Sequence, residues 1–197
     1  MFRTCGAAGA GKGKRTLTTS FRELVFQRLR VATLTYFLGI AAVPSTSFAG
    51  FVERFRDWSL YVHEDVSGKI CFITAIPIKQ EGNFSRRSQP RLFVTQFGGD
   101  RLRQEVSVDP GYAYRKGSTV EAQVGDSRFE LFTEGNRAWA RNALDDSRLI
   151  EAMRRGDQIQ LRGISTRDTW SLDTYSLAGF SAAHRAMTET CRDAAKR

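Results

Sequence analysis

The sequence is poor in the residues that most often carry catalysis or bind metals. Its 197 residues contain two histidines and three cysteines, and no two cysteines have the C-x-x-C spacing of redox and zinc motifs. A glycine-rich segment, GAAGAGKG at 6–13, approaches the phosphate-binding P-loop but has Gly13 where that loop needs a serine or threonine for Mg²⁺. Only five residues precede it, too few for the strand that a P-loop follows. The sequence therefore does not predict a nucleotide-binding enzyme.

The N-terminal region has the features of a secretory signal peptide. Basic residues precede a stretch of thirteen uncharged residues, VATLTYFLGIAAV at 31–43. Small residues occupy the third position and the last position before a predicted cleavage between Ala49 and Gly50. A helix of this length measures about 20 Å, short of the roughly 30 Å hydrocarbon core. An uncleaved anchor is therefore the weaker alternative. The leader exceeds the usual ~15–30 residues, and initiation at Val25 would shorten it.

Much of the positive charge lies in this leader. The whole chain has a net charge of +9, but residues 1–49 hold seven basic residues and one acidic residue. The predicted mature chain, residues 50–197, keeps a net charge of +3, and no nucleic-acid-binding motif accompanies it. We therefore expect no nucleic-acid partner. Two arginine pairs are interpreted as solvated charges rather than phosphate clamps: Arg86-Arg87 and Arg154-Arg155.

The body of the mature chain predicts short β-strands. Eight segments are rich in β-branched or aromatic residues, and several alternate apolar with polar residues. Glycine-containing turns separate them, including the two-residue hairpin signal Gly125-Asp126. This pattern favours one domain built as an antiparallel sandwich or barrel. The predicted strands are 58–62, 69–78, 91–97, 104–108, 118–124, 127–133, 158–165 and 169–177.

Two helices interrupt the strands. One is predicted over 145–156, with acids in its first turn, arginines in its last and Gly156 as its C-cap. The other covers the C-terminal residues from about 180. The segment 79–90 is predicted to be a long polar loop.

Two cysteines remain after the predicted cleavage, Cys71 and Cys191. Cys71 lies in an apolar strand, and Cys191 shares one helix face with Phe180, His184 and Met187. An even number of cysteines in an exported protein indicates a disulfide, which would tie the last helix to an early strand. A metal site is the alternative, although the two cysteines and two histidines lack zinc spacing.

Five segments together resemble the invasion-associated locus B family, in order and spacing, over roughly residues 55–191. The resemblance implies an exported protein of Gram-negative bacteria with an immunoglobulin-like β-sandwich and a role in host-cell invasion. It also implies no catalytic residues and no cofactor, and it assigns the family's paired cysteines to Cys71 and Cys191. The segments are RDWSLYVHEDVSGKICFI, EVSVDPGYAYRKGSTV, SRFELFTEGNRAWA, LIEAMRRGDQIQLRGISTR and DTYSLAGFSAA.

These observations favour a non-enzymatic periplasmic or envelope-associated protein that binds a protein partner in the envelope or on a host surface. The alternative is a periplasmic hydrolase. We expect His63 to be a solvated residue at a strand end and His184 to be a half-buried helix residue. A pocket that joins either histidine to a carboxylate and a hydroxyl would favour the hydrolase. A flat aromatic patch or an open strand edge would favour binding. Core packing is expected for Trp58, Trp139 and Trp170.

Overall fold

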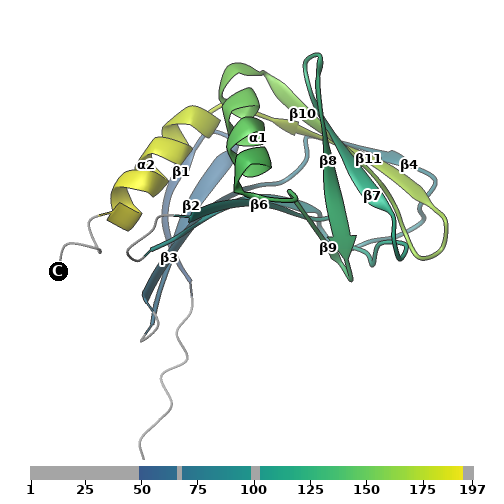
Figure 1. The fold of residues 1–197 in the computed structure, drawn as a ribbon, viewed down its shortest axis with the longest axis horizontal. Helices are drawn as coiled ribbons and strands as arrows, with labels where there is room; N and C mark the ends of the chain where they lie inside the picture. The colour runs from purple at the N-terminus through teal and green to yellow at the C-terminus, as the bar shows by residue number, and fades with distance from the viewer. Residues whose placement is uncertain (1–48, 66–67, 99–102, 193–197) are drawn as a thin grey trace, which may run out of the picture. The chain divides into compact units, whose positions relative to one another are not determined.

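The computed structural model describes residues 49–65, 68–98 and 103–192, which contain eleven strands and two helices (Figure 1). The predicted leader lies outside the described residues, apart from Ala49. None of the helices described is long and apolar enough to cross a membrane. The strands are β1 (Gly50–Phe55), β2 (Trp58–Asp65), β3 (Gly68–Ala75), β4 (Lys79–Gly82), β5 (Arg91–Phe97), β6 (Arg103–Asp109), β7 (Thr119–Val124), β8 (Ser127–Glu134), β9 (Arg137–Trp139), β10 (Gln158–Ile164) and β11 (Trp170–Ser176). The helices are α1 (Ala143–Arg155) and α2 (Phe180–Arg192).

The described strands form a single antiparallel sheet in the order β1-β2-β3-β5-β6-β9-β8-β7-β10-β11-β4. The mainly β, antiparallel fold with two helices predicted from the sequence is confirmed. The immunoglobulin-like two-sheet sandwich is not confirmed in detail, because the described strands form one continuous sheet. Strands from both halves of this sheet contribute to one hydrophobic core. The β7–β8 hairpin turns at Gly125 and Asp126, as predicted.

Three strands were not predicted from the sequence. All but the last residue of β1 are exposed, so no apolar face marks it. The strand β4 lies inside the segment predicted to be a polar loop, and it pairs with the edge of β11. Only three residues form β9, which pairs with both β6 and β8. Such strands depend on their neighbours in the sheet rather than on their own sequence.

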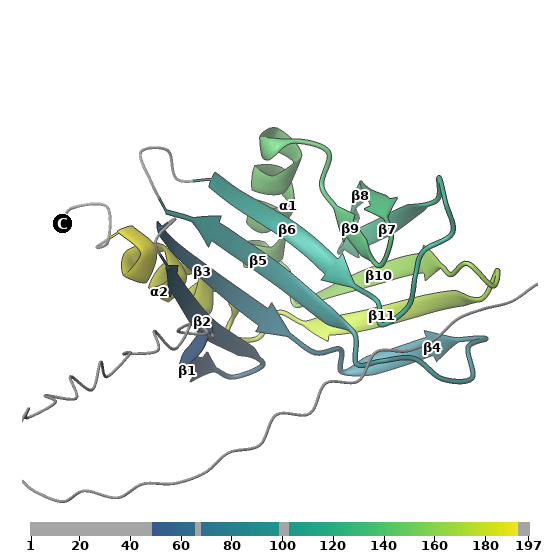
Figure 2. The same cartoon turned by 90° about the horizontal axis from the view of Figure 1, so that it is seen from below.

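The two helices cover the inner face of the strands β1, β2, β3, β5 and β6 (Figure 1). Figure 2 shows the opposite, outer face of the same strands. Alternation along each strand decides which side chains meet the helices. In β5, for example, Leu92 and Val94 are buried on the inner face, while Phe93 between them points outward.

Local sequence signals explain where the helices form. At the start of α1, the side chain of Asn142 accepts hydrogen bonds from the backbone N–H groups of Leu144 and Asp145, both at 3.0 Å. Such an N-cap satisfies donors that a helix start leaves unpaired. Acidic residues in the first turn and arginines in the last complement the helix dipole. The buried face of α2 consists of Phe180, Ala183, Met187 and Cys191.

A disulfide joins Cys71 of β3 to Cys191 of α2, with their Cα atoms 5.9 Å apart. Both residues are fully buried. The pairing predicted from the sequence is therefore confirmed, and it fixes the end of α2 to the inner face of the sheet. The apolar helix face predicted for α2 is also confirmed for its Phe180, Met187 and Cys191.

Candidate binding surface

Four aromatic side chains lie in a row on the outer face of β1, β2, β3 and β5. The rings of Phe51 and Tyr61 meet edge to face at 5.6 Å between centroids. Tyr61 stacks on Phe72 at 5.2 Å, and Phe72 lies 6.1 Å from Phe93. These contacts follow the sheet register, which pairs Phe51 with Tyr61 and Tyr61 with Phe72.

The row continues across the sheet toward β9 and β8. The guanidinium of Arg137 lies over the ring of Phe93, 4.8 Å from its centroid. Next to it on the same face, Trp139 and Phe132 are directly paired in the register and stack at 5.5 Å. We call the seven residues the aromatic strip: Phe51, Tyr61, Phe72, Phe93, Arg137, Trp139 and Phe132.

The aromatic strip is unusual for the solvent face of an antiparallel sheet, where polar residues normally alternate with buried ones. Phe51 is 60% exposed and Phe132 is 38% exposed, and the other aromatic rings of the strip are half-buried. Cross-strand aromatic pairs do stabilise a sheet. A row of exposed and half-buried rings that crosses several strands is also typical of an interaction surface.

A groove of about 330 Å³ lies beside the last two aromatic residues of the strip. Its walls include Trp139, Phe132 and the start of α1. At one side of the groove, the carboxylate of Asp146 accepts a hydrogen bond from the backbone N–H of Val106 at 2.8 Å. Burial raises the pKa of this carboxyl group. The lining also includes charged residues, among them Arg103. Apolar rings bordered by polar groups form the pattern of many protein-binding sites.

The two edges of the sheet are less suited to accept another chain. The edge strand β1 has an irregularity in its register between Phe51 and Glu53, and it carries Glu53 and Arg54 side by side. The other edge, β4, is four residues long and carries an ion pair between Lys79 and Glu81 at 3.0 Å. Bulges, charges and short length are the features by which natural edge strands avoid pairing. The face of the sheet is therefore a better candidate than its edges.

The three tryptophans have different environments. Trp58 is fully buried, packs on Phe180 at 4.9 Å and donates from its indole nitrogen to the carbonyl of Ser176 at 3.0 Å. The expected core packing is confirmed for Trp58. Trp139 and Trp170 are half-buried, so the core expectation is wrong for these two. Because their strands place them on the outer face, they remain available for contacts with a partner.

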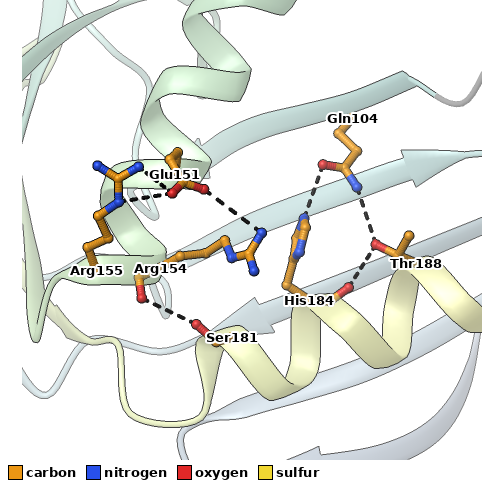
Figure 3. A network of polar contacts seen from close by, with 7 residues as sticks. All are labelled: Gln104, Glu151, Arg154, Arg155, Ser181, His184 and Thr188. Atoms are coloured by element: carbon orange, nitrogen blue, oxygen red, sulfur yellow. Dashed lines mark hydrogen bonds and ion pairs between the residues drawn. The ribbon is translucent and has the colours of Figure 1, made fainter.

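His184 lies on the face of α2 that points toward β6, and its ring contacts an amide rather than a carboxylate. Its Nε2 is 3.1 Å from the side-chain oxygen of Gln104 (Figure 3). The same amide donates to Thr188 at 3.4 Å and to Gln96 at 2.8 Å. The hydroxyl of Thr188 donates to the carbonyl of His184 one turn back along α2, at 2.9 Å.

The charges around His184 favour its neutral form. Burial lowers the pKa of its imidazole, and the nearby Arg154 lowers it further, whereas Glu151 acts in the opposite direction. Glu151 itself pairs with Arg155 through a 2.9 Å hydrogen bond and lies 3.9 Å from Arg154 (Figure 3). A triad histidine needs a carboxylate that orients it and a hydroxyl that it can deprotonate. His184 contacts neither in that arrangement, and it is half-buried as expected.

The other predicted candidates are not brought together. His63 lies near the end of β2, half-buried and paired in register with Ile70 on the outer face, one position along from the Val62–Cys71 pair. In the part of the chain that the structure describes, no three side chains of His, Cys, Asp or Glu are grouped so that they could hold a metal ion. Cys71 and Cys191 are joined in the disulfide.

The two arginine pairs also differ from each other. Arg154 and Arg155 are solvent-exposed at the end of α1, as expected. The prediction that Arg86 and Arg87 are both solvated is wrong for Arg87, because its side chain is only 3% exposed and forms an ion pair with the equally buried Asp173. The local sequence carries no signal for this burial, since the partner of Arg87 lies 86 positions away.

The fold and this surface define a disulfide-linked, mainly β protein with an exposed aromatic face. The chain belongs to the invasion associated locus B (IalB) protein family, whose model matches residues 58–188. Among solved structures, it is similar to the crystal structure of invasion associated protein b from Bartonella henselae, at 18% identity and a TM-score of 0.50. That match covers 70% of this chain and 96% of the other, and it supports the fold. No curated protein matches the chain.

Proposed function

We propose that this protein is exported to the periplasm or envelope and binds a protein partner, without catalysis, as part of an interaction with host cells. The observation that carries the proposal is the aromatic strip on the outer face of the sheet. Aromatic residues and arginine are the residue types that most often supply binding energy in protein interfaces. The strip combines both across several neighbouring strands.

Export is supported by two features of different kinds. The sequence begins with a basic region followed by an uncharged stretch and small residues, as secretory signals do. The disulfide between Cys71 and Cys191 is of the kind that persists in oxidising compartments. Fractionation of cells that express the full chain should recover a protein that starts at Gly50 in the periplasm. Recovery of the uncleaved chain in the membrane would contradict this.

The binding role can be tested by removing exposed rings from the strip. Phe51→Ser and Phe132→Ser remove side chains that are already solvent-exposed, so we expect little effect on folding. The matched control is Leu144→Ser, because Leu144 is 58% exposed on α1 and lies outside the strip. Each purified, oxidised protein is immobilised and incubated with envelope extract and with intact host-cell surface proteins, and captured proteins are identified by mass spectrometry.

The proposal predicts a partner that the wild-type chain and Leu144→Ser capture equally and that the two strip variants lose. Binding of the purified partner should weaken by about tenfold or more for a single lost anchor ring, which corresponds to roughly 1.4 kcal/mol. Equal capture by all four proteins would show that the strip is not the binding surface. Turnover of a substrate in the same extracts would favour a hydrolase instead.

A further inference from the structure

A second cavity lies at the opposite half of the sheet, away from the aromatic strip. Its volume is about 360 Å³, and its walls come from the β4–β5 loop, the β6–β7 connection and the β10–β11 turn. Figure 2 shows β4 alongside the β10–β11 hairpin, in agreement with the register of β4 and β11. The lining residues are Phe84, Ser85, Arg86, Tyr112, Ala113, Ser165, Thr166, Arg167 and Thr169.

The charge of this cavity is of one sign. Two of the lining residues are arginines and none is acidic. Both arginines are exposed, and neither guanidinium has an ion pair or hydrogen bond with the residues that the structure describes. The acidic residue next to Arg167 in the sequence, Asp168, pairs instead with Arg115 at 3.1 Å. Two guanidiniums without carboxylate partners form a site that attracts an anion.

Polar and aromatic groups complete the lining. Ser85 and Thr166 contribute exposed hydroxyl groups, which can donate hydrogen bonds to an anion. The rings of Phe84 and Tyr112 supply an apolar wall. Tyr112 is held in place because its hydroxyl lies 2.7 Å from that of Ser171. Apolar walls with a few placed polar groups are characteristic of small-molecule sites.

The walls of the cavity are fixed by contacts beneath them. The backbone N–H of Trp170 donates to the side chain of Asn83 at 2.7 Å, and Asn83 returns a bond to the Trp170 carbonyl at 3.2 Å. Ser88 donates from its backbone to Gly111 at 3.0 Å. Arg87 points into the interior and lies over the ring of Phe84 at 4.2 Å. Because Arg87 is anchored to Asp173, the backbone at its neighbour Arg86 is fixed at the cavity. Fixed walls lose less entropy when a ligand binds.

We propose that this cavity binds a sulfate or phosphate group carried on a sugar. The planar fork of arginine matches the oxygens of such groups with two parallel hydrogen bonds. The cavity has room for one ring beside the anionic group, and the rings of Phe84 and Tyr112 would face it. A membrane surface is disfavoured as the ligand, because none of the large hydrophobic residues that are exposed lines this cavity. The site is separate from the aromatic strip and does not depend on the proposed function.

The test uses the full chain with its disulfide formed and follows binding by titration calorimetry. The probes are glucose 6-sulfate and glucose 6-phosphate, with unmodified glucose and inorganic sulfate for comparison. The double variant Arg86→Gln/Arg167→Gln removes both guanidiniums. The control variant Arg128→Gln/Arg148→Gln removes two exposed arginines outside the cavity and changes the net charge equally. Arg167→Lys keeps the charge and removes the fork.

We expect at least one anionic sugar to bind the wild-type chain and the control variant more tightly than glucose or inorganic sulfate does. The Arg86→Gln/Arg167→Gln protein should bind that sugar at least about tenfold more weakly, and Arg167→Lys should lie between them. Equal affinity of the double variant and the control would overturn the proposal. So would anionic sugars that bind no better than glucose. The proposal would also be overturned, in favour of a lipid surface, if the sugars did not bind and the protein instead bound vesicles of phosphatidylglycerol and phosphatidylcholine through Arg86 and Arg167.

Discussion

The buried ion pair between Arg87 and Asp173 offers a sharp test of how the β4–β5 loop is held. Each side chain is only 3% exposed. Arg87 reaches the carboxylate with both terminal nitrogens, one of them at 2.7 Å, and also donates to the carbonyl of Pro110 at 3.1 Å and to Gln80 at 2.9 Å. Arg87→Met keeps an unbranched chain and removes the guanidinium. It leaves the charge of Asp173 buried without its partner.

Breaking a buried pair from one side costs about 3–5 kcal/mol, because the remaining charge is uncompensated. The matched control is Arg115→Met, since Arg115 pairs with Asp168 at 3.1 Å but both side chains are more than half exposed. Exposed pairs contribute about 0–1 kcal/mol. Urea denaturation followed by circular dichroism gives the free energy of unfolding for each protein. The double variant Arg87→Met/Asp173→Leu should recover most of the loss, because an apolar pair leaves no charge to bury.

The same argument predicts a dependence on pH. Burial raises the pKa of Asp173 above its ordinary value, and the hydrogen bond and charge of Arg87 act against this increase. A carboxyl whose folded pKa is raised stabilises the fold at low pH and loses that contribution as pH rises through the folded pKa. Without Arg87 the pKa rises further, so the deficit of Arg87→Met should shrink as the solution is acidified. Equal losses for Arg87→Met and Arg115→Met, at all pH values, would refute the reasoning.

Three other expectations follow from individual residues. Cys71→Ser/Cys191→Ser removes a disulfide that joins residues 120 positions apart, for which the chain-entropy model gives a stabilisation of about 5 kcal/mol. We expect the free energy of unfolding to fall by roughly 2–5 kcal/mol in denaturant melts. An unchanged denaturation midpoint would contradict this expectation. Gly179→Ala should lower the free energy of unfolding by roughly 1–3 kcal/mol or more, because Gly179 has φ +90° and an added Cβ would clash with the Phe55 carbonyl. The control Gly125→Ala should cost less in the same melts, because Gly125 has φ +55° and open space around it. Because burial lowers the pKa of His184, the contribution of this residue to stability is present above its unfolded-state pKa of about 6.5 and is lost as pH falls through its folded-state pKa. His184→Gln should therefore flatten the pH dependence of the melting temperature in that range. An unchanged slope would argue against this.

Alternation and local signals were enough to predict much of the fold. In β5, the pattern RLFVTQF predicted the whole strand, since side chains of a strand point alternately to its two faces. The end of α1 at Gly156 was predicted from its arginines and this glycine, whereas its start lies two residues before the predicted Asp145, at Ala143, with Asn142 as N-cap. The pairing of Cys71 with Cys191 followed from the small number of cysteines in a chain with a predicted export signal. Each of these inferences depends on residues near one another in the sequence or on a single possible pairing.

The aromatic strip was not predicted from the sequence. The sequence places Phe72, Phe93 and Phe132 within predicted strands. It does not show that β3 lies beside β5, or that β9 places Trp139 next to Phe132. The order of strands in a sheet depends on contacts between distant segments, and local propensity carries no information about it.

By itself, the sequence determined that this chain is mainly β, that its last helix is tied to an early strand, and approximately where the long strands and the two helices lie. Only the tertiary structure decided that Arg87 is buried while its neighbour Arg86 lines a cavity, and that rings from separate strands form one surface. The physical reason is the same in both cases. Burial and charge pairing act between residues such as Arg87 and Asp173, 86 positions apart, and these become neighbours only when the sheet has formed.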